Sequence, residues 1–161
     1  MKNILLASIF IVLLSMKSNA QILKIEIRAT GLTCSMCSNA IFKQLESIPE
    51  VDSLETDLNT NTYMITLKNG SNINPKIFKE KVEKAGFFVG IFIVTATPEI
   101  FTQASYIILN EKPNNDSLIT FQVLDKGYVT DKEYKKHSKT YKEIATYSDG
   151  NEDNFHIKIM K

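Results

Sequence analysis

The hydrophobic pattern of the first half of the chain predicts a small sheet that carries helices. Apolar and polar residues alternate over residues 23–29, which is typical of a half-buried strand. A helix is expected over about residues 35–47, because apolar residues recur there at helical spacings of three and four. Two further runs, 51–58 and 62–68, flank an Asn-Thr-Asn turn and predict a β-hairpin.

A second helix and a fourth strand complete this part of the chain. Asn74 is expected to cap the helix, with Pro75 in its first turn and Gly86 just after its end. The apolar run over residues 87–94 then predicts a strand. The resulting order, β-α-β-β-α-β, predicts a ferredoxin-like α+β domain over residues 21–94, in which an antiparallel sheet has two helices on one face.

Residues 95–161 predict a smaller, strand-rich α+β accessory segment whose fold the pattern does not identify. The runs 105–110 and 118–124 are expected to be strands, and alternation over residues 155–160 predicts a final strand. Thr130 begins a capping box, which indicates the start of a helix between the second of these strands and the last. Tyr134, His137, Tyr141 and Ile144 recur along this helix at spacings of three, four and three. We expect this segment either to extend the first sheet or to pack against it.

The two histidines of the chain both lie in this second segment. His137 lies on the apolar face of the predicted helix and is expected to be a packed core histidine. His156 is expected on the outward phase of the last strand. Neither has a cysteine or histidine neighbour at ligand spacing, so a second metal site is not expected. The lysines over residues 132–136 are expected to form a solvated helix face.

The first 20 residues have the features of a secretory signal peptide. A basic start precedes an apolar run over residues 4–14, and Ser18-Asn19-Ala20 supplies the small residues expected before a cleavage site. The apolar run is shorter than the roughly 20 residues that span a bilayer. We therefore expect an exported, periplasmic protein without a stable membrane anchor after cleavage; an uncleaved anchor is the alternative.

The net charge of the chain argues against nucleic acid and anionic membrane surfaces as partners. Cleavage before Gln21 would remove Lys2 and Lys17 from the 19 basic residues, leaving 17 against 18 acidic ones. A net charge near zero gives no electrostatic basis for binding nucleic acid or an anionic membrane surface.

Candidate chemistry is concentrated in the only two cysteines, Cys34 and Cys37. A disulfide between them would close a very small loop and stabilise the fold little, so metal or redox chemistry is favoured. Cys34 is expected in the loop after the first strand and Cys37 in the first turn of the helix, where the helix end favours thiolate. Two thiolates without a histidine or carboxylate suit copper(I) or mercury(II) better than zinc(II), which takes four ligands.

The surrounding residues resemble the heavy-metal-associated domain of copper chaperones, metal-pumping ATPases and the periplasmic mercury-binding protein. The resemblance is carried by Gly31-Leu32-Thr33-Cys34-Ser35-Met36-Cys37 after the first strand, by Pro49-Glu50-Val51, and by Lys84-Ala85-Gly86-Phe87 after the second helix. It covers residues 21–94, roughly half of the chain that remains after cleavage.

The resemblance implies a role for each residue of the metal loop. Cys34 and Cys37 would be the metal ligands, and Leu32, Thr33 and Phe87 would support the loop. Family members that handle zinc or cadmium often carry an acid at the position of Thr33, so this residue favours copper. Leu32 stands where the family more often has methionine. Met36 is either a third, thioether ligand or an outward-facing side chain.

These observations together predict a non-enzymatic protein, with no catalytic residues, that holds copper(I) and transfers it to a protein partner. A periplasmic mercury(II) carrier is the nearest alternative, and zinc(II) is a further candidate ion. A dithiol–disulfide exchange protein and a metal-sensing interaction module belong to different functional classes and remain open.

Overall fold

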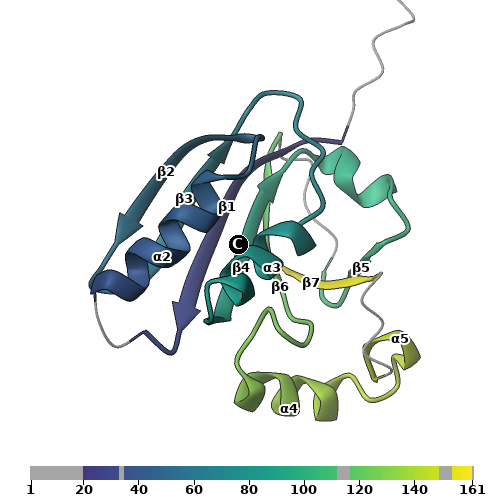
Figure 1. Cartoon of the computed structure of the whole chain (residues 1–161). Helices are drawn as coiled ribbons and strands as arrows, with labels where there is room; N and C mark the ends of the chain where they lie inside the picture. Colours follow the sequence, from purple (N-terminus) through teal and green to yellow (C-terminus); the bar gives the residue numbers. More distant parts are fainter. Residues whose placement is uncertain (1–19, 33–34, 112–116, 149–153, 161) are drawn as a thin grey trace, which may run out of the picture.

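The structure is a computed structural model that describes residues 20–32, 35–111, 117–148 and 154–160. These residues form one seven-stranded sheet with the strand order β2-β3-β1-β4-β6-β7-β5 (Figure 1). The elements in chain order are β1 (Ile22–Thr30), α2 (Ser35–Glu46), β2 (Val51–Asp57), β3 (Thr62–Leu67), α3 (Lys76–Lys84), β4 (Phe88–Ala96), the 3-10 helix η1 (Pro98–Thr102), β5 (Tyr106–Ile108), β6 (Ile119–Val123), α4 (Asp131–Thr140), α5 (Ala145–Ser148) and β7 (Phe155–Ile159).

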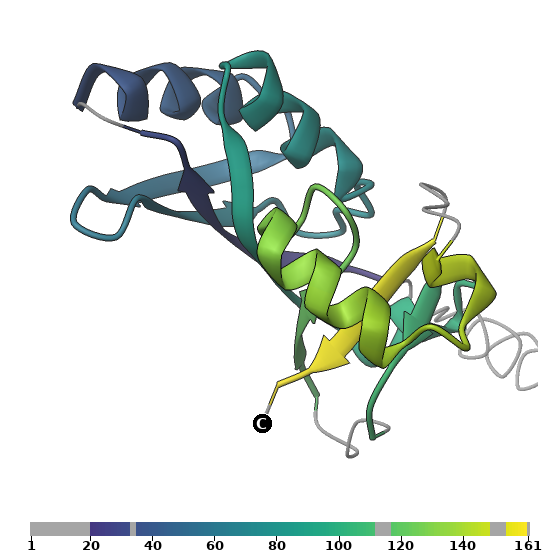
Figure 2. The ribbon, with the colours of Figure 1, turned by 90° about the horizontal axis from the view of Figure 1, so that it is seen from below.

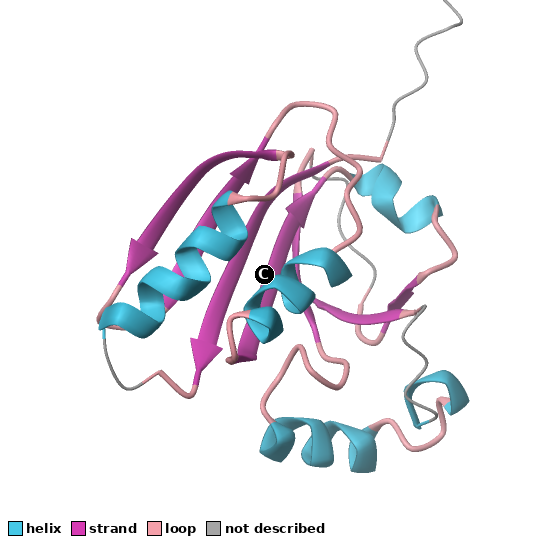
Figure 3. Ribbon diagram, in the orientation of Figure 1, coloured by secondary structure: helices cyan, strands magenta, loops and turns pink. Residues whose placement is uncertain are grey.

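The first six elements confirm the predicted β-α-β-β-α-β order. β1 pairs antiparallel with both β3 and β4, and β3 pairs antiparallel with β2. The helices α2 and α3 lie side by side on one face of these four strands (Figures 2 and 3). This is the ferredoxin-like arrangement. The ends of its helices and strands lie within two residues of those expected from the pattern.

Both ends of α3 form as the sequence predicts. The Asn74 side-chain oxygen accepts a hydrogen bond of 2.9 Å from the backbone N–H of Lys76. Pro75 has the helical backbone angles −53° and −26°, which its ring favours at a helix start. Gly86, at φ +90°, supplies the left-handed conformation that ends the helix.

The core of this part lies between the sheet and its two helices. In β1 the alternate side chains of Ile25, Ile27 and Ala29 are buried, while Lys24 and Arg28 are exposed. Such alternation leaves one sheet face to be covered by apolar helix residues. The residues that cover it are Ile41 and Leu45 of α2 with Phe78 and Val82 of α3.

The second segment extends the first sheet. β6 pairs antiparallel with the second half of β4, from Ile93 to Ala96, and β7 pairs antiparallel with β6. β5 then joins β7 in parallel. The core is continuous across this junction, since Phe92 of β4 meets the Tyr128 ring edge-on at 5.1 Å. Of the two arrangements left open by the pattern, extension of the sheet is the one observed.

The helix α4 begins as predicted and ends earlier. Its capping box is complete: Thr130 Oγ1 accepts from the Glu133 N–H, and the Glu133 carboxylate accepts from the Thr130 N–H, both at 3.3 Å. The helix ends at Thr140, and a turn leads into α5. Tyr141 and Ile144 pack beside Tyr147 in a second apolar cluster, so their spacing reflects a shared core and not one continuous helix.

Within the described residues, no helix is long and apolar enough to cross a membrane.

Candidate metal centre

The described part of the metal loop lies at one end of the sheet, between β1 and α2. Residues 33 and 34 lie outside the described residues, so the predicted roles of Thr33 and Cys34 stay predictions. Cys37 is the third residue of α2 and is partly exposed. Gly31, at φ +87°, turns the chain out of β1, a backbone conformation that glycine adopts without strain.

The side chains around the loop fall into two groups. Leu32 and Phe87 are partly buried and pack against the main core, and their predicted support of the metal loop stays a prediction. Met36 is 81 % exposed, so its thioether faces solvent, and its role as a third ligand remains a prediction.

Two hydrogen bonds tie this end of β1 to its neighbours. Thr30 lies opposite Phe88 at the start of β4, and its hydroxyl donates to the Phe88 carbonyl at 3.3 Å. On the other side, the Ala29 N–H donates to the carbonyl of Asn61, in the β2–β3 turn, at 3.0 Å. The strand that leads into the loop is therefore held on both sides.

Tyr63 of β3 makes a contact with the start of α2 that the sequence did not reveal. Its hydroxyl donates a 3.1 Å hydrogen bond to the carbonyl of Ser38, the residue after Cys37. Burial raises the pKa of Tyr63 above its usual range; the Ser38 side chain partly offsets this rise, and negative charge on Cys37 adds to it. The phenol and the thiol therefore lie within electrostatic reach of one another.

His156 is buried, so its expected outward position on the last strand is wrong. The residue is 0 % exposed, and three consecutive residues of β7, Phe155 to Ile157, are buried. The reason is that Tyr147 of α5 covers the face of β7 that would otherwise meet solvent, with its ring 5.0 Å from the imidazole and perpendicular to it.

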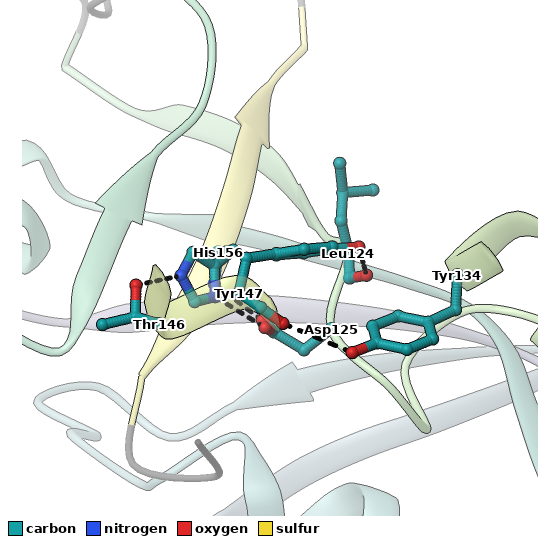
Figure 4. A network of polar contacts seen from close by, with 6 residues as sticks. All are labelled: Leu124, Asp125, Tyr134, Thr146, Tyr147 and His156. Atoms are coloured by element: carbon teal, nitrogen blue, oxygen red, sulfur yellow. Dashed lines mark hydrogen bonds and ion pairs between the residues drawn. The ribbon is translucent and has the colours of Figure 1, made fainter. Parts of the chain in front are cut away.

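A hydrogen-bond network surrounds the buried imidazole (Figure 4). Asp125 accepts from the His156 backbone N–H at 2.6 Å and contacts Nδ1 at 2.7 Å. A carboxylate only accepts, so Nδ1 carries a proton, and in the neutral ring Nε2 then accepts from the Thr146 hydroxyl at 2.9 Å. The network joins the end of β6, α5 and β7, which is a structural role.

His137 is only partly buried, which corrects the expectation of a packed core histidine. No residue of α4 is fully buried, and the His137 ring stacks on Tyr141 with a centroid distance of 6.1 Å. Across the described ranges, no group of three or more histidine, cysteine, aspartate or glutamate side chains is arranged to hold a metal ion.

Comparison with known proteins identifies the first part of the chain. Residues 26–88 match the sequence model of the heavy-metal-associated domain. The chain therefore contains a heavy-metal-associated domain, a metal-binding module, and the resemblance noted from the cysteine loop is confirmed. Comparison with curated proteins gives no match.

Solved structures similar to this chain include copper-handling domains. The yeast copper transporter domain Ccc2a is 31% identical, over 40% of this chain and 88% of that one, with a TM-score of 0.36. A copper-binding domain of a P-type ATPase is 29% identical, over 40% and 86%, at 0.37. The N-terminal domain of a potential copper-translocating P-type ATPase from Bacillus subtilis is 28% identical, over 42% and 82%, at 0.37.

Proposed function

We propose that this protein binds one copper(I) ion through the thiolates of Cys34 and Cys37 and passes the ion to a protein partner. The observation that carries the proposal is the match of residues 26–88 to a heavy-metal-associated domain. Within that domain, Cys37 lies in the first turn of α2 and is partly exposed, so an incoming ion can reach it.

The chemistry of the cysteine pair supports a soft ion. The start of α2 has N–H groups without helical partners and a positive dipole end, and both stabilise thiolate relative to thiol. Thiolates are soft ligands, and two of them satisfy the low coordination number that copper(I) accepts. Zinc(II) would need two further ligands from outside this pair.

Transfer to a partner would proceed by ligand exchange. A partner thiolate forms a third bond to the copper ion, and the bond to Cys34 or Cys37 then breaks. The thiolate that leaves takes its electron pair with it, so copper stays in the +1 state and no redox partner is needed. Cys37 is partly exposed, so an ion bound to its sulfur would be accessible to such an attack.

We further propose that the protein acts outside the cytoplasm, in the periplasm. The support is the sequence of residues 1–20, with a basic start, a short apolar run and small residues before Gln21. An oxidising compartment would tend to join two nearby thiols, so the cysteine pair would bind copper only while it is kept reduced.

The test is metal binding by the reduced protein. Copper(I), mercury(II) and zinc(II) are added separately, and stoichiometry and affinity are measured against a competing chelator. We expect one copper(I) per chain, and we expect Cys34→Ser and Cys37→Ser each to weaken binding at least about a hundredfold. Removal of a group that only supports a ligand lowers metal affinity by about ten- to hundredfold. A loss of about a hundredfold or more would therefore identify each cysteine as a direct ligand.

Control variants separate the competing functions. Met36→Leu keeps the size of the exposed side chain and removes its sulfur, so a loss of affinity in this variant would assign a third ligand. Retention of tight copper binding by the double cysteine variant would contradict the proposal. Preference for mercury(II) would favour a mercury carrier, and reduction of insulin without metal binding would favour dithiol–disulfide exchange.

A further inference from the structure

We infer that Tyr63 is a positioning residue for the metal site: its buried hydroxyl holds the first turn of α2, and thereby Cys37, in place against the sheet. The inference rests on the proposed function, because the affinity that it concerns is that of the cysteine pair. It assigns to a residue of β3, far from the cysteines in sequence, part of the control of how tightly the ion is held.

The geometry links a strand to the start of a helix. Tyr63 lies opposite Ile27 of β1 and Thr56 of β2, in the interior of the four-stranded part of the sheet. Its side chain is 0 % exposed and belongs to the core beneath the helices. The hydroxyl reaches the Ser38 carbonyl at 3.1 Å, and Ser38 is itself only 4 % exposed.

This hydrogen bond acts where a helix is least restrained. The first N–H groups of a helix have no partner within the helix itself, and helix ends tend to fray. A helical carbonyl has two lone pairs and uses one for the N–H four residues later, so the Ser38 carbonyl can also accept from the phenol. The bond therefore ties the turn that carries Cys37 to β3, and limits how far Cys37 can move.

Packing alone does not account for a tyrosine at this position. Phenylalanine would fill nearly the same volume and would bury no polar group. A buried hydroxyl is costly unless it is hydrogen-bonded, and here its partner is the residue next to a predicted metal ligand. The hydroxyl is thus placed to act on the metal loop, while the ring contributes to the core.

The consequence for binding follows from where the restraint is applied. With Tyr63 present, the first turn of α2 is already fixed before the ion arrives. Without the hydroxyl, the ion has to order that turn, and the free-energy cost appears as weaker binding. The loss of one hydrogen bond of ordinary strength corresponds to about fivefold in an equilibrium constant.

The test is Tyr63→Phe in the full chain. Copper(I) affinity is measured by chelator competition at a temperature where circular dichroism shows that the variant is folded. We expect the dissociation constant to rise about fivefold, with most of the change in the dissociation rate. The matched control is Tyr106→Phe, which removes the hydroxyl of another buried tyrosine, on β5, and should leave copper affinity unchanged.

Several outcomes would overturn the inference. Affinity within twofold of the wild type in folded Y63F would show that the hydroxyl serves stability alone, while tight wild-type binding would leave the proposed function standing. Absence of copper binding by the wild type would refute both. If Y63F does not fold, amide hydrogen exchange of the ion-free wild type decides: protection in the first turn of α2 is expected, and rapid exchange there contradicts the inference.

Discussion

Replacing Asp125 by alanine should destabilise the whole chain, including the heavy-metal-associated domain, whose strand β4 pairs with β6. The carboxylate of Asp125 accepts two hydrogen bonds from His156, one from the backbone N–H at 2.6 Å and one from Nδ1 at 2.7 Å. In the variant the imidazole and its backbone stay in place, because Tyr147 and the sheet still enclose them. Two donors of a fully buried residue then lose their acceptor.

The magnitude follows from the cost of leaving buried donors unpaired. Each such group costs about 1–3 kcal/mol, and the His156 side chain is 0 % exposed. The Asp125 side chain is 16 % exposed, so water can enter the space it vacates and replace part of one bond. We expect a loss of about 2–4 kcal/mol, a large fraction of the 5–15 kcal/mol by which ordinary domains are stable.

The assay is urea unfolding followed by far-ultraviolet circular dichroism. Two variants calibrate it. Thr146→Val removes only the partner of Nε2 at a partly exposed position and should cost about 1 kcal/mol. Asp52→Ala removes an exposed carboxylate from β2 and should stay within about 0.5 kcal/mol of the wild type.

Two results would refute the reasoning. A loss below about 1 kcal/mol in D125A would show that the network is not closed to water. Two separate unfolding transitions in the wild type, with only one of them shifted in D125A, would show that the second segment unfolds independently. The shared sheet and continuous core predict a single cooperative transition.

Two further predictions concern the second segment. Gly127→Ala should cost about 1–2 kcal/mol, measured as a shift in the urea midpoint, because Gly127 has φ +85° and a Cβ there would meet the Lys79 side chain; an unchanged midpoint would contradict it. Burial lowers the pKa of His137 in the folded protein below its ordinary value of 6.5. The stability that the neutral imidazole contributes is therefore fully present above pH 6.5, and it is lost as the pH falls through the lower pKa of the folded state. The charged groups that act on His137 are Glu133, Lys136 and Lys158. His137→Asn should therefore lose less stability than the wild type between pH 7 and pH 5, and equal losses would argue against this account.

The fold of the first part could be predicted because its signals are local. Asn74, Pro75 and Gly86 mark the ends of one helix through their own backbone preferences, and period-two alternation marks the strands. The pairing of β4 with β6 could not be predicted in this way. Alternation shows which side chains are buried but not which strand lies alongside, and β6 is separated from β4 by η1 and β5.

The errors in the second segment share a physical cause. Alternation predicts an outward His156 because it assumes that one face of a strand meets solvent, whereas Tyr147 of α5 covers that face of β7. The helix expected through Ile144 ends at Thr140, because apolar residues on both sides of a turn contact the same cluster. In both cases tertiary packing, which has no local pattern, decided the outcome.

The candidate site shows the same division. The cysteine spacing, its place after a strand and the second matching loop pointed to a heavy-metal-associated domain, and the family comparison agrees. The sequence pattern identifies Tyr63 only as a residue of the second hairpin strand. Its acceptor is a backbone carbonyl, which every residue has, so no sequence pattern marks the contact.

The position of β4 between β1 and β6 has a consequence for solubility. β4 reads Phe-Val-Gly-Ile-Phe-Ile-Val-Thr-Ala and contains no charged residue. If the chain ended after the heavy-metal-associated domain, β4 would be an edge strand with a row of unpaired backbone N–H and C=O groups. Such an edge can pair with another copy of the chain and lead to aggregation. By pairing with Ile93–Ala96, β6 occupies half of that row. The second segment thus shields β4 from self-association, which matters because β4 has no charged residue of its own to prevent it.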